Sequence, residues 1–125
     1  MSSWLGGAVS EGELLSRLPV LSGPLAALRR DAAGECPGRT APIIAARVQQ
    51  LVTGEGSLDA FGELDEAEQV VVELAEQFLL DVHGISAALV ARLGLHYTPA
   101  EQIALMFQLA FADGFTKFRQ VFEVA

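Results

Sequence analysis

Two histidines and a tyrosine are the side chains of this sequence best suited to moving protons: His83, His96 and Tyr97. Histidine changes its charge near neutral pH, and a tyrosine hydroxyl can donate or accept a proton at a reacting atom. Asp113 and Lys117 stand one helical turn apart and could support such a group. We therefore take His96, Tyr97 and His83 as candidate catalytic residues, with Asp113 and Lys117 in support. The chemistry that these groups could carry out without a cofactor is proton transfer.

The same side chains also have structural explanations, which the sequence leaves open. His83 is expected in the last turn of a helix, where a protonated imidazole interacts favourably with the helix dipole. His96 and Tyr97 belong to the segment LGLHYTPAE, which is predicted to be a loop, and functional groups often lie in loops. The tyrosine ring could instead pack beneath this turn while the histidine faces water.

Neither a metal ion nor a cofactor is expected. Two histidines and one cysteine, Cys36, are too few for a zinc site within one chain. The sequence contains no HExxH, no GxSxG and no phosphate-binding glycine loop in a strand–helix context. A lone cysteine cannot form an internal disulfide bond, which fits a reducing compartment.

The charge balance disfavours several classes of partner. A net charge of −8 and a pI near 4.6 argue against nucleic acid and against an anionic membrane, since both attract clustered lysine and arginine. Between Arg47 and Arg92 there are nine acidic residues and no lysine or arginine, a pattern typical of a solvated face.

The first residues, MSSWLGGAVSEGELL, lack the features of a signal peptide, so a cytoplasmic protein is expected. Seven arginines against one lysine, with no asparagine, suggest a bacterial source of high GC content.

Proline, glycine and capping residues divide the chain into helices, and the predicted fold class is all-α. We expect a single domain over residues 1–125, a compact bundle of about five or six helices. Its parts are short helices and a loop (1–39), a helix and an acidic linker (40–64), and a regular helical half (65–125). The predicted helices are 11–18, opened by Ser10 and Glu13; 24–33, opened by Pro24 and closed by Gly34; 41–53, capped by Thr40 and ended by Gly54; 66–82, opened by Asp65 and Glu68 and capped by Gly84; 87–93, between Ser86 and Gly94; and 99 to the chain end, opened by Thr98, Pro99 and Glu101. Residues 54–64 are rich in turn formers and are predicted to be a mobile connection.

Phenylalanine is concentrated in the last predicted helix, which has five of the seven rings within residues 107–122. At 100° per residue these five fall within an arc of about 80°, and polar residues occupy the opposite side. The stripe is therefore predicted to be a packing seam rather than a cofactor site or a membrane face. The segment Ile103–Ala112 is apolar nearly all round, so we expect a homo-oligomer through this segment. Gly114 lies beside the stripe, where another helix could approach closely.

The second half of the sequence resembles a known family. The pieces LDEAEQ, GISAALVARL, YTPAEQIAL and LAFADGFTKF follow the order found in the C-terminal half of carboxymuconolactone decarboxylase-like proteins, which include alkylhydroperoxidase D. The resemblance spans roughly half of the chain and is a helical pattern rather than a catalytic motif. It implies the alkylhydroperoxidase D-like helical fold and a small oligomer with an apolar cavity between helices.

The first half departs from this family where its catalytic cysteines would stand. RTAPIIAARVQQLVTGEG resembles the helix that leads to the family's Cys-x-x-Cys motif, but Glu55, Gly56 and Ser57 follow Gly54 instead. Cys36 alone cannot supply both thiols of a peroxidase, so no thiol peroxidase activity is expected. The resemblance leaves two leading hypotheses. One is a non-redox enzyme that acts on an apolar substrate by proton transfer, as in decarboxylation, isomerisation or cyclisation. The other is a family member without catalysis that binds a ligand or serves as an accessory oligomer. A thiol protein that uses Cys36 between subunits is the third.

Overall fold

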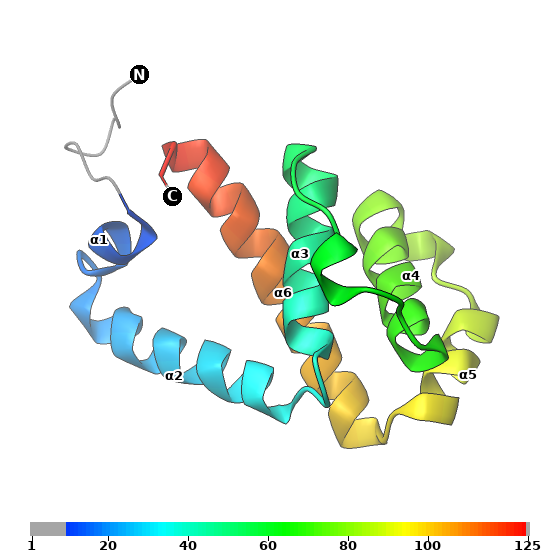
Figure 1. The fold of residues 1–125 in the computed structure, drawn as a ribbon. Coiled ribbons are helices and arrows are strands. Elements are labelled where there is room, and N and C mark those ends of the chain that lie inside the picture. Colours follow the sequence, from blue (N-terminus) through cyan, green and yellow to red (C-terminus); the bar gives the residue numbers. More distant parts are fainter. Residues whose placement is uncertain (1–9, 125) are drawn as a thin grey trace.

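The computed structural model describes residues 10–124, and every regular element within this range is helical (Figure 1). The all-α prediction is thereby confirmed. The α-helices are α1 (Glu11–Leu15), α2 (Pro19–Glu35), α3 (Thr40–Thr53), α4 (Glu66–Leu80), α5 (Ala87–His96) and α6 (Pro99–Phe122), with two 3₁₀ turns, η1 (Asp59–Phe61) and η2 (Val82–Gly84). None of these helices combines the length and the hydropathy that crossing a membrane would require.

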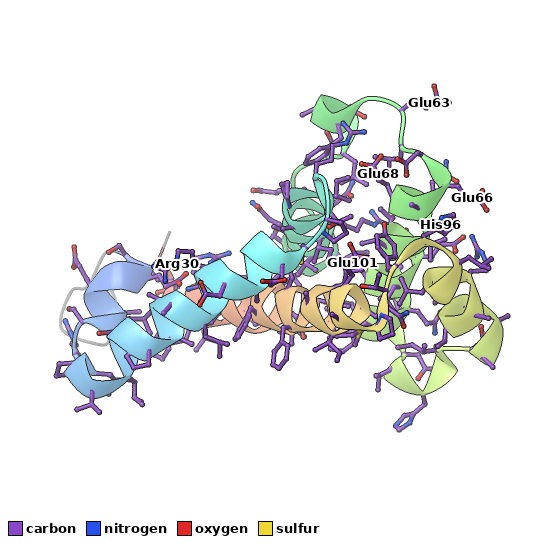
Figure 2. The ribbon with its side chains drawn as sticks, turned by 90° about the horizontal axis from the view of Figure 1, so that it is seen from below. Arg30, Glu63, Glu66, Glu68, His96 and Glu101 are labelled. Atoms are coloured by element: carbon purple, nitrogen blue, oxygen red, sulfur yellow. The ribbon has the colours of Figure 1, made fainter. Side chains whose placement is uncertain are left out.

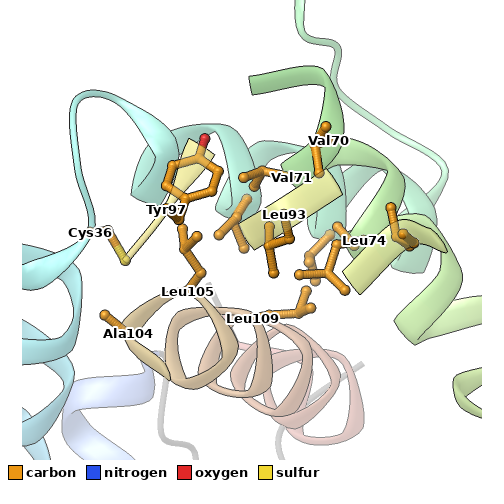
Figure 3. Packing of buried hydrophobic residues seen from close by; sticks show 13 residues of the cluster. Cys36, Val70, Val71, Leu74, Leu93, Tyr97, Ala104, Leu105 and Leu109 are labelled. Atoms are coloured by element: carbon orange, nitrogen blue, oxygen red, sulfur yellow. The ribbon is translucent and has the colours of Figure 1, made fainter. Parts of the chain in front are cut away.

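The centre of the fold is α3, which packs between α4 and α6 (Figure 1). Ile44 and Val48, one helical turn apart on α3, are at most 1% exposed. They belong to one apolar cluster that also includes side chains of α4, α5 and α6 (Figure 3). Removing this apolar surface from water is the main force that holds the helices together. The cluster members drawn from the last three helices are Val70, Val71, Leu74, Ala75, Leu89, Leu93, Ala104, Leu105 and Leu109.

Helix starts are capped largely as the sequence predicts. The Asp65 carboxylate accepts the Glu68 backbone N–H, and the Glu68 side chain accepts the Asp65 N–H, so a reciprocal capping box opens α4. Thr98 and Glu101 form the same arrangement at the start of α6. These interactions satisfy backbone donors that a helix leaves unpaired at its first turn. The remaining predicted features of this kind are the side-chain caps of Ser10 and Ser86 and the left-handed Gly54 that ends α3.

The second helix begins earlier than predicted, at Pro19 rather than Pro24. Pro19 occupies the first turn, where its missing N–H costs nothing. Pro24 therefore lies inside the helix and removes one backbone hydrogen bond. The carbonyl that loses its helical donor is that of Val20, four residues earlier. Val20 is 81% exposed, so this carbonyl is open to water. Thr40 is also displaced: it is the first helical residue of α3, and its hydroxyl donates to the Pro37 carbonyl at 2.7 Å.

The end of α4 corrects another prediction. The helix stops at Leu80, because Asp81 is extended and its carboxylate accepts the His83 backbone N–H at 3.1 Å. Residues 82–84 then form η2, so Gly84 does not cap α4 and His83 is not in the last turn of that helix. The fifth helix is longer than predicted, because it continues past Gly94 to His96.

One arginine makes hydrogen bonds to the connection from α3 to α4. Arg39 donates two hydrogen bonds to the Glu68 carboxylate, at 2.7 and 3.1 Å. The same guanidinium donates to the carbonyls of Phe61 at 2.6 Å and Glu63 at 3.2 Å. Phe61 and Glu63 are 22 and 24 residues from Arg39 in sequence. The local composition of the connection therefore could not predict these hydrogen bonds.

The phenylalanine stripe lies beside the buried face of α6 rather than on it. The buried face is formed by Ala104, Leu105, Leu109 and Thr116, and the centre of the stripe is rotated from it by roughly 120°. Phe107 is 48% exposed and the other four rings are partly buried. Neighbouring rings along the helix contact one another in stacked, tilted or edge-on arrangements, with 4.8–6.4 Å between ring centroids. The predicted seam is thus only half formed within this chain, because the smaller side chains allow the closest approach to α3.

Candidate functional site

Tyr97 lies at the junction of α5 and α6 and is 7% exposed. Its hydroxyl donates a hydrogen bond of 2.7 Å to the Ala67 carbonyl in the first turn of α4. Burial, and then the negative charges of Asp65, Glu68 and Glu101, raise the pKa of Tyr97 to about 12. The phenol is therefore neutral at ordinary pH and commits its proton to a backbone oxygen. This geometry matches the structural explanation, in which the ring packs under the turn.

His96 is the last residue of α5, and its side chain is 24% exposed. Its Nε2 atom is 4.0 Å from Oε1 of Glu66 at the start of α4. Figure 2 shows His96 and Glu66 on the same flank of the molecule. The imidazole also lies edge-on to the Tyr97 ring, with 6.4 Å between ring centroids. Of the predicted catalytic residues, His96 and Tyr97 are therefore brought together, beside the acidic first turn of α4.

The other predicted residues lie elsewhere. His83 is exposed in η2, at the opposite end of α4 from Glu66. Asp113 and Lys117 form an ion pair of 2.7 Å on α6. Asp113 follows Thr98 by fifteen residues, about 22 Å along the helix axis. The five predicted side chains thus do not converge on one reacting position in this chain.

Cys36 caps the C-terminal end of α2 and is 7% exposed. Its thiol donates to the Ala32 carbonyl at 3.3 Å, and burial raises the pKa of the thiol. A thiol of this kind is poorly nucleophilic, because the reactive form is the exposed thiolate. Within residues 10–124, no group of three or more histidine, cysteine and acidic side chains is arranged to hold a metal ion.

A cleft of about 710 Å³ lies between α4, α5 and α6. Its lining is apolar except for Gln102, whose side-chain N–H donates to the Tyr97 carbonyl at 2.9 Å. None of the five predicted catalytic residues lines it. The all-round apolar segment after Ile103 is the sequence signal for this cleft, because such a segment needs partners on several sides. The lining includes Leu74, Phe78, Val90, Ile103, Met106 and Phe107.

The rim of this cleft is unusually exposed for apolar side chains. Val90 is 49% exposed, Ile103 59% and Phe107 48%. Single exposed apolar residues are ordinary, whereas several around one cleft mark a surface where something binds. The cleft can therefore hold an apolar body, and it has one amide to orient a polar group.

A second cleft, of about 450 Å³, lies between α2, α3 and α6 and has a different character. Arg29, Arg30 and Arg119 line it, together with two glutamines and several alanines. The sequence analysis did not select these arginines. They are spread over 90 residues and follow no motif, so only the packing of α6 against α2 brings them together.

Comparison of this chain with protein-family models, with curated proteins and with solved structures finds no match. A function for the chain therefore rests on the chemistry of its own side chains and on the clefts described above.

Proposed function

We propose that this protein binds a small apolar molecule between α4, α5 and α6, and that a second copy of the chain covers the site. It would be a carboxymuconolactone decarboxylase-like protein that has lost its chemistry and serves as a ligand-binding oligomer. The observation that carries this proposal is the cleft of about 710 Å³, whose lining is apolar except for Gln102. A cleft of this size and character is typical of small-molecule sites.

The order of capped helices supports the alkylhydroperoxidase D-like arrangement of residues 65–125. An acid-capped helix, α4, is followed by the short α5 and then by the long α6, which opens with Thr98 and Pro99. This is the order that the resemblance implies. The helical pattern alone carries no activity, because one fold supports many functions.

Binding is favoured over proton transfer by the positions of the polar groups. A general acid or base must come within about 3 Å of the atom whose proton it moves. The Tyr97 hydroxyl donates its hydrogen bond to the Ala67 carbonyl, and neither histidine lines the apolar cleft. The side chain of Gln102 ends in an amide, which does not titrate. It can therefore orient a bound molecule but cannot transfer a proton to it.

The outer face of α6 supports a second copy as the cover. Ile103, Phe107, Ala110, Gly114 and Val121 recur at intervals of 4, 3, 4 and 7 residues, a spacing that favours packing of one helix against another. Among residues 10–124, no side chain or other helix comes within 4 Å of the position that a Cβ of Gly114 would take. Glycine inside a helix lowers helix stability by about 0.8–1 kcal/mol relative to alanine. Close approach of a partner helix would explain why a glycine occupies this position. A second α6 crossing here would also cover the rim of the cleft.

Ligand binding is tested with N-phenyl-1-naphthylamine, a neutral apolar dye that fluoresces in apolar surroundings. We expect saturable binding to the protein and a loss of affinity of roughly tenfold in the Met106→Gln variant, because the new amide must be desolvated in the cleft. Leu95→Gln is the matched control, since Leu95 is 80% exposed and lies outside the lining. Equal affinity of both variants, or no saturable binding, would exclude this site.

Self-association is tested by sedimentation at micromolar concentration. We expect a dimer or larger oligomer, and dissociation to a monomer in Phe107→Glu, because a charge would be buried without a partner. Leu95→Glu adds the same charge away from α6 and should leave the oligomer intact. A wild-type monomer that still binds the dye would retain the ligand site and remove the second copy from the proposal.

A further inference from the structure

One carboxylate inside the molecule is held between two arginines from distant helices. Glu11, on α1, accepts hydrogen bonds from Arg29 of α2 and from Arg119 of α6, the second at 2.7 Å. The Glu11 side chain is 15% exposed, and the arginines are about a third exposed. Burial alone would raise the pKa of Glu11, but the hydrogen bonds and charges of the two arginines outweigh it and lower this pKa.

The two arginines also line the cleft of about 450 Å³ between α2, α3 and α6. The Arg29 guanidinium lies 3.8 Å above the centre of the Phe115 ring, so it is oriented by a cation–π contact. Arg119 is held from its other side by Thr116, whose hydroxyl accepts at 3.3 Å. Both guanidinium groups are therefore oriented before a ligand binds, which lowers the entropic cost of ordering their side chains on binding.

The cleft has the shape and charge for an acid that bears a flat apolar ring. Phe111 and Phe115 form an aromatic wall, and alanines at 26, 33, 45 and 112 leave room beside it. Arg30 also lines the cleft, but its side chain is 74% exposed and pairs with Asp31 at 3.5 Å. The cations that meet an internal carboxylate here are therefore Arg29 and Arg119, which share Glu11. Two arginines on one carboxylate leave a local positive charge in a chain whose net charge is −8.

We propose that this cleft binds a small organic carboxylate, which replaces Glu11 between Arg29 and Arg119. Guanidinium groups form strong, charge-assisted hydrogen bonds with carboxylates, and each arginine here donates to a different oxygen of Glu11. Glu11 therefore occupies the position that the carboxylate of a ligand would take. The ring of the ligand lies against Phe111 and Phe115. This site is separate from the apolar cleft between α4, α5 and α6, and it does not depend on the function proposed above.

The helix that carries Glu11 is suited to being displaced. α1 has five residues, far fewer than an isolated helix needs for stability, and Leu14 is its one buried residue. Figure 1 shows α1 at the open end of the angle between α2 and α6, next to the C-terminal end of α6. Release of Glu11 would leave the central apolar cluster in place, because that cluster contains no residue of α1.

The probe for this site is benzoate, added to the full ¹⁵N-labelled protein and followed by amide chemical shifts. We expect saturable shifts at Phe111 and Phe115 and, in the same titration, at residues 11–15. Benzyl alcohol, which has the ring without the charge, and inorganic phosphate, which has the charge without the ring, should each bind at least tenfold more weakly. Equal binding of either compound would overturn the assigned ligand class.

Two variants with opposite expected effects separate a binding role from a structural one. Glu11→Gln removes the internal competitor and should tighten benzoate binding roughly tenfold. Arg119→Gln removes one fork and should weaken it at least tenfold, while Arg92→Gln, which breaks the Glu73 ion pair elsewhere, should change nothing. If Arg119→Gln fails to fold, Glu11→Gln and the wild-type shifts at residues 11–15 still decide. Unchanged affinity in Glu11→Gln, or wild-type binding without shifts at residues 11–15, would overturn the proposal.

Discussion

Replacing Leu105 with alanine is expected to lower the free energy of unfolding by about 3–5 kcal/mol. Leu105 is fully buried on α6 and belongs to the central cluster with α3 and α4 (Figure 3). The loss combines the transfer free energy of the removed atoms with the cavity that they leave, because the surrounding helices relax only in part. A change of this size approaches the whole stability of a small domain. Urea denaturation of the variant and the parent measures it.

The matched control for this prediction is Leu95→Ala. Leu95 is 80% exposed on α5, so its removal should change the free energy of unfolding by less than about 0.5 kcal/mol. Phe111→Ala should fall between the two, because Phe111 is partly buried beside α2. If Phe111→Ala lowered the free energy of unfolding as much as Leu105→Ala does, the phenylalanine stripe would be part of the core.

Tyr97→Phe is expected to have the second large effect, and that effect depends on pH. At neutral pH the variant loses the hydrogen bond to the Ala67 carbonyl, which keeps its place as an acceptor within α4, at a cost of about 0.5–1.5 kcal/mol. The pKa of Tyr97 is raised from 10.0 to about 12 in the folded protein. Below pH 10 the phenol is protonated in both the folded and unfolded states, so its stabilising contribution is fully present.

Between pH 10 and about 12 the unfolded chain loses this proton while the folded protein retains it. The free energy of unfolding therefore falls as pH rises through this window, by on the order of 2 kcal/mol from this group. Tyr97→Phe should lack this part of the decline. Cys36, whose pKa is also raised by burial, is the same in both proteins, so the difference between their denaturation curves isolates Tyr97.

The spectrum offers a direct check, because Tyr97 is the only tyrosine of the chain. Tyrosinate absorbance near 295 nm should rise with a midpoint near pH 12 in the folded protein. A midpoint near 10 with the fold intact would mean that the hydroxyl is open to solvent, and it would return Tyr97 to the list of available acid–base groups.

Local features of the fold could be predicted from the sequence because they depend on neighbours in the chain. The capping boxes at Asp65 and Thr98 join residues three apart, and they open α4 and α6 as expected. The end of α3 at Gly54 follows in the same way from one residue's tolerance of a positive φ. Where two local signals compete, as Pro19 and Pro24 do, the sequence pattern selected the wrong start.

The roles of side chains depend on which helices meet. Composition predicts a mobile connection over residues 54–64, and it gives no sign that Arg39 donates to the carbonyls of Phe61 and Glu63 across more than twenty residues of chain. The phenylalanine stripe is apolar by any measure of sequence, but the face of α6 that reaches α3 is the one with smaller side chains. Periodicity gives the direction of an apolar face without saying which of two neighbouring faces becomes the core.

The sequence by itself determined the helical class, most of the helix starts and ends, the lack of a paired cysteine and the residues capable of proton transfer. Only the tertiary structure decided that Tyr97 donates its proton to Ala67, that His83 lies apart from His96, and that Arg29 and Arg119 meet at Glu11. Hydrogen-bonded turns and caps are formed within a few residues, so they are legible in the chain. Clefts and ion pairs form between helices, and their geometry depends on the packing of side chains that no local pattern specifies.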